Sequence, residues 1–244
     1  MNKLSLVATL FLLCLPACGE AESGDGESGN AQLQGAGNTG GSTALTAEEA
    51  AADPERAARV AAAAEIPIDT KNLLSAIEPD EYVAEIRAAL SHAGTREDPI
   101  PVTTDFLGGW MFDETLDDPF PPHVKAIDGK YIIVKGFMLP GVDFEGITNF
   151  HMVRSLWGCC FGAPPRVNEL ILVRTPGGEG LRYTYNTLEI VGKVEVEFEL
   201  LDGLIEDLYR MQAESIIEGD FDDPLAPEGA TAADLGDFLP EMEF

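Results

Sequence analysis

The spacing of apolar positions predicts helices in the first part of the chain. In segment 79–92, three large apolar residues recur at the spacing of one helical face, and Gly94 follows where such a helix would end. They are Tyr82, Ile86 and Leu90. Upstream, Asp53-Pro54 supplies an N-cap and a first-turn proline before an alanine-rich run that ends near residue 64. We therefore expect a helical extension over residues 45–100.

Beyond Pro101 the pattern of apolar residues changes to that of β-strands. Segment 130–138 is rich in β-branched and aromatic residues and follows an Asp128-Gly129 turn. Further strands are expected at 149–155, at 169–174 and within 183–201, whereas 204–217 fits either a helix or a strand. Short strands separated by turns predict a mainly β domain over residues 101–218: a small OB-like Greek-key barrel or half-open barrel.

The N-terminal segment carries a targeting pattern. A short positive stretch precedes an apolar run that is too short to span a bilayer, and Leu15-Pro16-Ala17-Cys18 closes it. This resembles a bacterial lipoprotein signal over residues 1–17. The resemblance implies that Cys18 is lipidated, with fatty acyl chains such as palmitate, and becomes the first mature residue. An ordinary secretory signal is the alternative, and both imply export to the cell envelope, facing the periplasm or the exterior.

Two flanking segments have compositions typical of disorder. Residues 18–44 are rich in Gly, Ser and other small or polar residues, so they predict a flexible tether. Residues 219–244 contain no basic residue and many acidic ones, and we expect a disordered acidic tail. The chain as a whole has a formal net charge of −28, which disfavours nucleic-acid binding. Contact with a membrane is expected through the lipid on Cys18.

A series of motifs in the second half resembles a known family. In order these are Gly129-Lys130, Gly136-Phe137-Met138-Leu139-Pro140, the segment from Cys159 to Pro165 (CCFGAPP), Asn168, and Val191-Gly192. The series, spread over residues 102–217, resembles an uncharacterised family of bacterial envelope proteins with an OB-like barrel, a domain of unknown function. The resemblance implies that fold and that location, and it brings no established activity.

The adjacent pair Cys159-Cys160 is the main chemical candidate, and three interpretations stay open. The two thiolates could bind a soft metal such as zinc or copper, with His151 and also His123 as further ligands. They could instead cycle through a strained vicinal disulfide as a thiol-redox site. In the third interpretation both side chains only shape or fill a tight turn.

Other residues have structural explanations that we prefer. Three aromatic residues, Trp110, Phe112 and Trp157, suit a core better than a ligand groove. Pro164-Pro165 and Asn168 are expected to shape a turn. The row of Glu195, Glu197 and Glu199 could attract a cation such as Ca²⁺, but it is typical of a solvated strand face.

The sequence contains no catalytic or nucleotide-binding motif that would support an enzyme. We therefore expect a lipid-anchored envelope protein that acts as a binding or accessory module, with an envelope protein such as a transporter component as partner. The alternatives are a soft-metal protein and a thiol-redox protein that use the cysteine pair.

Overall fold

The computed structural model describes residues 53–74, 77–139, 141–201, 204–205 and 207–236. The predicted signal segment, the lipidation site Cys18, the tether 18–44 and residues 237–244 of the predicted tail lie outside the described residues. The side chain of Cys160 is also outside them. Within the described part of the chain, no helix has both the length and the apolar character needed to cross a bilayer.

Five strands close into a barrel. They are β2 (Tyr131–Met138), β3 (Asn149–Val153), β4 (Ile171–Arg174), β5 (Leu188–Val196) and β8 (Tyr209–Glu218). The hydrogen-bonded order is β2-β3-β4-β8-β5, and β5 pairs back onto β2 to complete the circle. The β4–β8 pair is parallel and the other pairs of the circle are antiparallel. The domain is therefore the small OB-like Greek-key barrel that the strand pattern predicts.

Three shorter strands lie beside the barrel. Strand β1 (Ile100–Val102) pairs in parallel with Ile132 to Val134 of β2. Strands β6 (Leu200–Leu201) and β7 (Leu204–Ile205) pair with each other between β5 and β8. The register of β5 against β8 shifts at Val191/Gly192, which marks a β-bulge.

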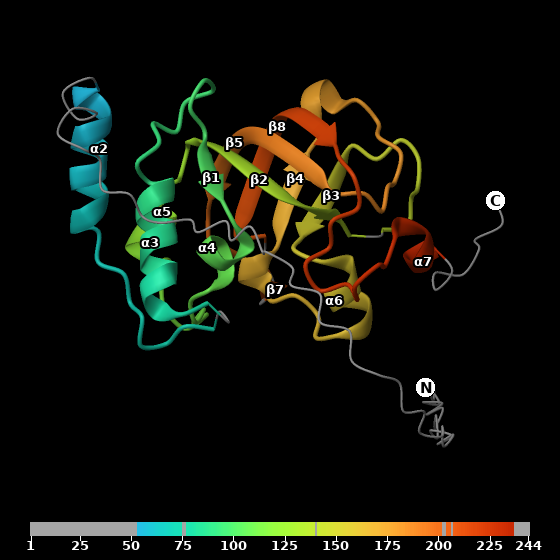
Figure 1. The fold of residues 1–244 in the computed structure, drawn as a ribbon, viewed down its shortest axis with the longest axis horizontal. Coiled ribbons are helices and arrows are strands. Elements are labelled where there is room, and N and C mark those ends of the chain that lie inside the picture. Colours follow the sequence, from blue (N-terminus) through green and yellow to red (C-terminus); the bar gives the residue numbers. More distant parts are fainter. Residues whose placement is uncertain (1–52, 75–76, 140, 202–203, 206, 237–244) are drawn as a thin grey trace, which may run out of the picture. The chain divides into compact units, whose positions relative to one another are not determined.

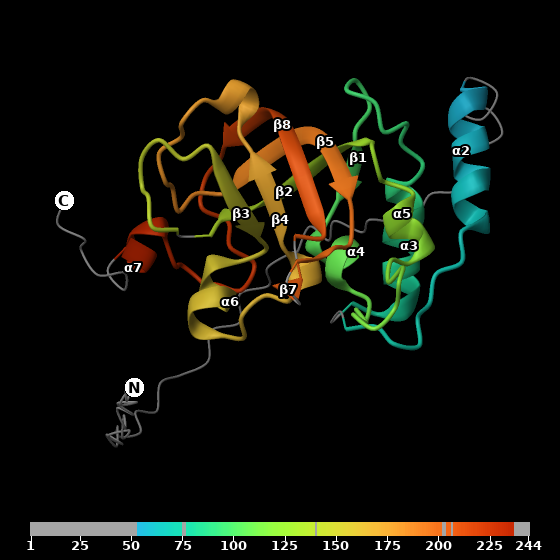
Figure 2. The same ribbon diagram turned by 180° about the vertical axis from the view of Figure 1, so that it is seen from behind.

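The helices are short. They are α2 (Pro54–Glu65), α3 (Pro79–Ala89), α4 (Thr104–Gly108), α5 (Pro122–Lys125), α6 (Leu156–Phe161) and α7 (Ala232–Gly236), with 3-10 turns η1 (Val167–Glu169) and η2 (Pro176–Gly178). In Figures 1 and 2, α2, α3 and α5 lie at one end of the barrel, and α6 and α7 lie at the other. Helix α2 begins as predicted, because the Asp53 carboxylate accepts a hydrogen bond of 2.8 Å from the amide of Arg56.

The barrel and the preceding helix share one core. The alternating inward residues of β2, β5 and β8 are buried together with Tyr82 and Ile86 of α3. Trp110 belongs to the same core, and Phe112 packs against it. The helical extension predicted from the sequence therefore exists, and its α3 contributes directly to the packing of the barrel.

Two segments differ from the strand pattern read in the sequence. The alternation over 183–201 does not form one continuous strand: β5 covers Leu188–Val196, and Leu200, which is exposed, belongs to the two-residue β6. The ambiguous segment 204–217 resolves as β7 followed by β8, so the helical alternative is wrong. Pairing with β4 on one side and β5 on the other decides this, and neither partner is local in sequence.

The acidic C-terminal segment is ordered where the structure describes it. Leu235 of α7 is only 2% exposed and belongs to a second, smaller core with Phe137, Val153 and Leu156. Phe221 packs against the same cluster. Residues 219–236 therefore differ from the expected disorder, because these apolar side chains find a surface on the outside of the barrel.

Candidate functional site

The cysteine pair lies on a short helix whose first turn is held by its own N-cap and by one distant segment. Ser155 caps α6, since its hydroxyl accepts a hydrogen bond of 2.7 Å from the amide of Gly158. The carboxylate of Asp223 accepts hydrogen bonds from the Ser155 hydroxyl at 2.5 Å and from the Trp157 amide at 2.9 Å. The C-terminal segment thus fixes the helix that carries Cys159.

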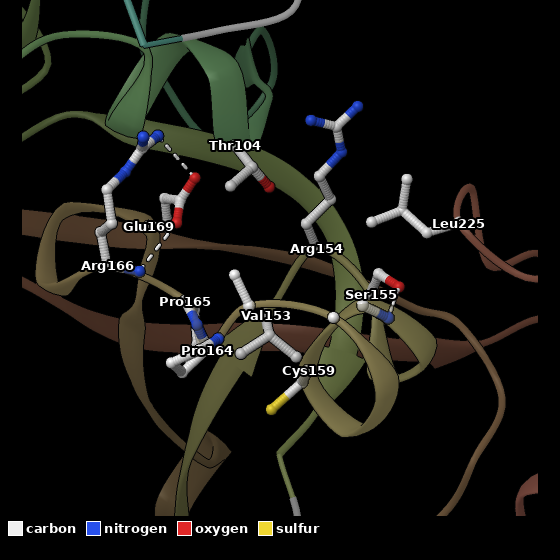
Figure 3. A pocket seen from close by; sticks show the side chains of 13 residues that line it. Thr104, Val153, Arg154, Ser155, Cys159, Pro164, Pro165, Arg166, Glu169 and Leu225 are labelled. Carbon is white, nitrogen blue, oxygen red and sulfur yellow. Dashed lines mark hydrogen bonds and ion pairs between the residues drawn. The ribbon is translucent and has the colours of Figure 1, made fainter. Parts of the chain in front are cut away.

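A cleft of about 370 Å³ opens beside this helix (Figure 3). Its walls come from the start of α4, the end of β3, helix α6, the loop that leads to η1, and the C-terminal segment. The side chains shown are mostly small or apolar, with Cys159 and Leu225 on two of the walls. Gly158 permits this arrangement, because a Cβ at that position would lie 2.7 Å from Cδ1 of Leu225.

Two arginines give the cleft its charge, and each is matched by a carboxylate. Arg154 pairs with Asp105 at 3.2 Å. Arg166 donates to the Glu169 carboxylate at 2.7 Å and to the carbonyl of Gly108 at 2.8 Å. The Glu169 carboxylate also accepts from the Arg166 amide, as the dashed lines of Figure 3 show. The cleft is thus close to neutral within a strongly acidic chain.

The thiol of Cys159 has the environment of a structural cysteine. Burial raises its pKa above the ordinary value. Reactive thiols are instead kept as thiolates by nearby cations or metal ions. At neutral pH the Cys159 side chain is therefore a neutral, weakly polar part of the cleft wall.

A second cleft, of about 510 Å³, adjoins the first and shares Thr104 and Arg154 with it. It runs along β2 beside the end of β1. Strand β1 pairs with β2 only as far as Val134, and β3 begins its pairing at Phe137. Lys135 and Gly136, which lie between these two pairings, line the cleft. We call the two clefts together the α6 groove.

The histidines that the sequence offered as metal ligands lie elsewhere. His151 lines a different cleft and bonds the carboxylate of Asp207, with 2.7 Å between Nε2 and Oδ1. His123 is buried against Tyr82 and Phe106, and burial lowers its pKa to about 4. Among the described residues, no group of three or more His, Cys, Asp and Glu side chains could hold a metal ion. A site that uses Cys160 stays a prediction.

Asn168, Trp157 and the row of three glutamates, for which we preferred structural roles, lie in a loop contact, against a core and on the surface. Asn168 is buried and its amide donates to the Trp110 carbonyl at 3.0 Å, which ties η1 to the end of α4. Trp157 packs in the smaller core. Glu195, Glu197 and Glu199 are exposed. Glu197 pairs with Arg210 at 2.8 Å. The three side chains are solvated, but only Glu195 belongs to a strand, because β5 ends at Val196.

Several residues that line the α6 groove or hold its helix in place were not identified from the sequence. Arg154, Arg166 and Asp223 belong to three segments whose spacing along the chain carries no common motif. Ser155 did have a local signal, since a serine that precedes a short helix is a favoured N-cap. Asp223 had none, because its partner Ser155 is 68 positions away.

Comparison with known proteins identifies a domain without an assigned activity. Residues 117–218 match a family model described as "Protein of unknown function (DUF3299)". A DUF3299 family protein from Pseudomonas aeruginosa, known from a crystal structure, is 27% identical; the match covers 44% of this chain and 73% of that chain, with a TM-score of 0.33. No curated protein matches the chain. Residues 117–218, which contain the five strands of the barrel, are thus a DUF3299 family domain.

Proposed function

We propose that this protein is a lipid-anchored binding or accessory module of the bacterial envelope, and that its α6 groove takes an extended segment of a second envelope protein. The N-terminal pattern that ends at Cys18 supports the anchor and the location. The groove supports the binding role.

The single observation that carries the binding role is the open stretch of β2 inside the groove. Neither β1 nor β3 pairs with Lys135 and Gly136, so a short piece of strand edge faces the cleft. Extended peptides commonly bind by adding to such an edge, with neighbouring pockets that take alternate side chains. The adjoining cleft beside Cys159 provides a mostly apolar pocket of this kind.

The environment of Cys159 favours binding over thiol chemistry. Its pKa is raised by burial, which lowers the thiolate fraction that a redox cycle would need. In the proposed function the thiol contributes volume and apolar surface, and its sulfur chemistry is dispensable.

Two substitutions at one position separate these roles. Cys159→Ser keeps the side chain small and removes the thiol, whereas Cys159→Trp fills the pocket.

A photo-crosslinking residue in place of Leu225, which is 54% exposed at the groove, should capture one defined envelope protein in living cells. The same residue in place of Leu116, which is 50% exposed in a different loop, is the matched control.

We expect the crosslink from position 225 in the otherwise unchanged protein and in Cys159→Ser, and its loss in Cys159→Trp. Equal capture from positions 225 and 116 would contradict a specific groove. Loss of the crosslink in Cys159→Ser as well would favour thiol chemistry or metal binding. Thermal melting of both variants shows whether they are folded.

The anchor is tested separately. Cells that express the chain and are fed labelled palmitate should incorporate the label, and Cys18→Ser should abolish it. A chain that is exported and cleaved but never labelled would refute the anchor and leave the proposed groove untouched.

A further inference from the structure

A third surface of the barrel domain brings three aromatic side chains together between two loops. Residues 142–147 and residues 181–185 are joined by three main-chain hydrogen bonds, including one of 2.8 Å from the Tyr183 amide to the Phe144 carbonyl. Ile147 and Leu181 form a β-bridge next to it. The two loops therefore lie side by side as one ribbon just before the start of β3.

This ribbon encloses a cleft of about 590 Å³, which we call the aromatic cleft. It is lined by Val142, Asp143, Phe144, Glu145, Arg182, Tyr183 and Tyr185. None of these residues lines the α6 groove. The aromatic cleft is therefore a separate site from the groove.

The ring of Tyr183 stands at a steep angle to each of the other two rings. Phe144 and Tyr183 have centroids 5.3 Å apart at 73°, and Tyr183 and Tyr185 have centroids 5.0 Å apart at 89°. All three side chains are partly exposed. Tyr183 and Tyr185 also pack against the two cores, so only part of each ring is available to a ligand. Because Tyr183 stands steeply against both neighbouring rings, we expect the available surfaces to point in more than one direction. A compact ligand could thus contact π-electrons on two sides.

The polar residues of the cleft carry more negative than positive charge. Asp143 and Glu145 supply two carboxylates and Arg182 one guanidinium. Arg182 pairs with Glu145 at 2.6 Å, but their side chains are 79% and 71% exposed, so water and salt weaken this pair. The field of a chain with a net charge of −28 further favours cations near this surface.

From this combination we propose that the aromatic cleft binds a small organic cation that carries an alkylammonium group. Perpendicular aromatic rings with nearby carboxylates are the arrangement that stabilises such a cation, because the ring faces attract the positive charge while the methyl groups pack on them. An anionic ligand would meet two carboxylates and the field of the whole chain. A neutral ligand could donate hydrogen bonds to the carboxylates, but it would gain no charge–charge attraction from them.

The direct test uses the protein purified from its own host, after any processing there, in a polyoxyethylene detergent that contains no ammonium group. Choline and tetramethylammonium are titrated by NMR or calorimetry against the uncharged isostere of choline, in which carbon replaces nitrogen. We expect the cations to bind at least about fivefold more tightly than the isostere, a ratio in the range of cation–π contacts at partly exposed sites. Added salt should weaken the binding.

Comparison with phosphocholine separates two sources of the ligand. Tighter binding of phosphocholine than of choline would identify a lipid head group, whose phosphate could contact Arg182. Tighter binding of choline would identify a free solute. Equal binding of choline and its isostere, or binding of N-acetylglucosamine instead of either cation, would overturn the proposal.

Matched variants locate the site. Tyr185→Leu and Asp143→Asn should each weaken choline binding severalfold. Phe161→Leu removes an exposed ring on α6, and Glu179→Gln removes an exposed carboxylate from the loop before Arg182; both should leave binding unchanged. Similar weakening in all four variants would place the cation elsewhere. The comparison between choline and its isostere tests the proposal even where a variant unfolds.

Discussion

Replacement of Asp223 by alanine tests the way in which the C-terminal segment holds the cysteine helix. This carboxylate is 8% exposed and accepts three hydrogen bonds. Their donors are the Ser155 hydroxyl at 2.5 Å, the Trp157 amide at 2.9 Å and the Leu225 amide at 3.0 Å. Two of these donors belong to the first turn of α6 and its cap, so the change removes the hydrogen bonds between residues 219–236 and that helix and leaves the apolar packing of Leu235 in place.

The expected loss of stability follows from those contacts. A hydrogen bond to a charged group contributes about 1.5–3 kcal/mol, and donors that reach water after the change recover part of it. We therefore expect the free energy of unfolding to fall by about 3 kcal/mol for Asp223→Ala. For a domain of this size that corresponds to a melting temperature lower by roughly 6–12 °C.

The measurement is urea unfolding followed by tryptophan fluorescence, with Trp157 beside the altered contact as a local probe. Asp222→Ala is the matched control, because it removes the same charge from an exposed neighbour. We expect the control to change stability by less than about 0.5 kcal/mol. Equal effects of the two substitutions would refute the reasoning, since total acidity rather than the docking of Asp223 would then govern stability.

Three further predictions concern the core, the thiol and the barrel. Burial lowers the pKa of His123 to about 4, below its value in the unfolded chain. At a pH between these two values only the unfolded chain binds a proton at His123, so the free energy of unfolding should fall as the pH drops through this range. His123→Gln should flatten this part of a curve of stability against pH. Since burial raises the pKa of Cys159, mass spectrometry should show its alkylation to be slower in the native protein than in urea, and equal rates would contradict its burial. Gly192→Ala should lower the free energy of unfolding by about 1–3 kcal/mol, because the added Cβ would meet the Gln212 carbonyl oxygen and lie 2.8 Å from the Ala213 Cα. Gly141→Ala should be nearly neutral in the same unfolding assay, because nothing lies within 4 Å of its Cβ.

Much of the barrel could be predicted because its strands have local signals. Strand β2 alternates buried and accessible positions and follows a turn in which Gly129 has a φ of +67°. Helix α2 begins at its Asp53 cap. The short helices α4, α5 and α6 were missed, since segments of four to six residues contain too little of the helical period to be recognised.

The candidate site was predictable only in part. We identified Cys159 as a candidate because it forms an adjacent pair with Cys160, and Cys159 does line a cleft. Its separation from His151 was not predictable, because the two residues are close in sequence but the chain bends after β3 and places them on different clefts. The arginines and Asp223 entered the site through contacts between distant segments.

The sequence by itself determined the acidic character and predicted the class of fold, because these depend on totals or on neighbouring residues; the export signal stays a prediction. Only the tertiary structure decided that 209–218 is a strand, that the acidic segment 219–236 packs on the barrel, and that Phe144 faces Tyr183 across two loops. The physical reason is the same in each case. The stabilising partners are segments far away in the chain, and local periodicity contains no record of them.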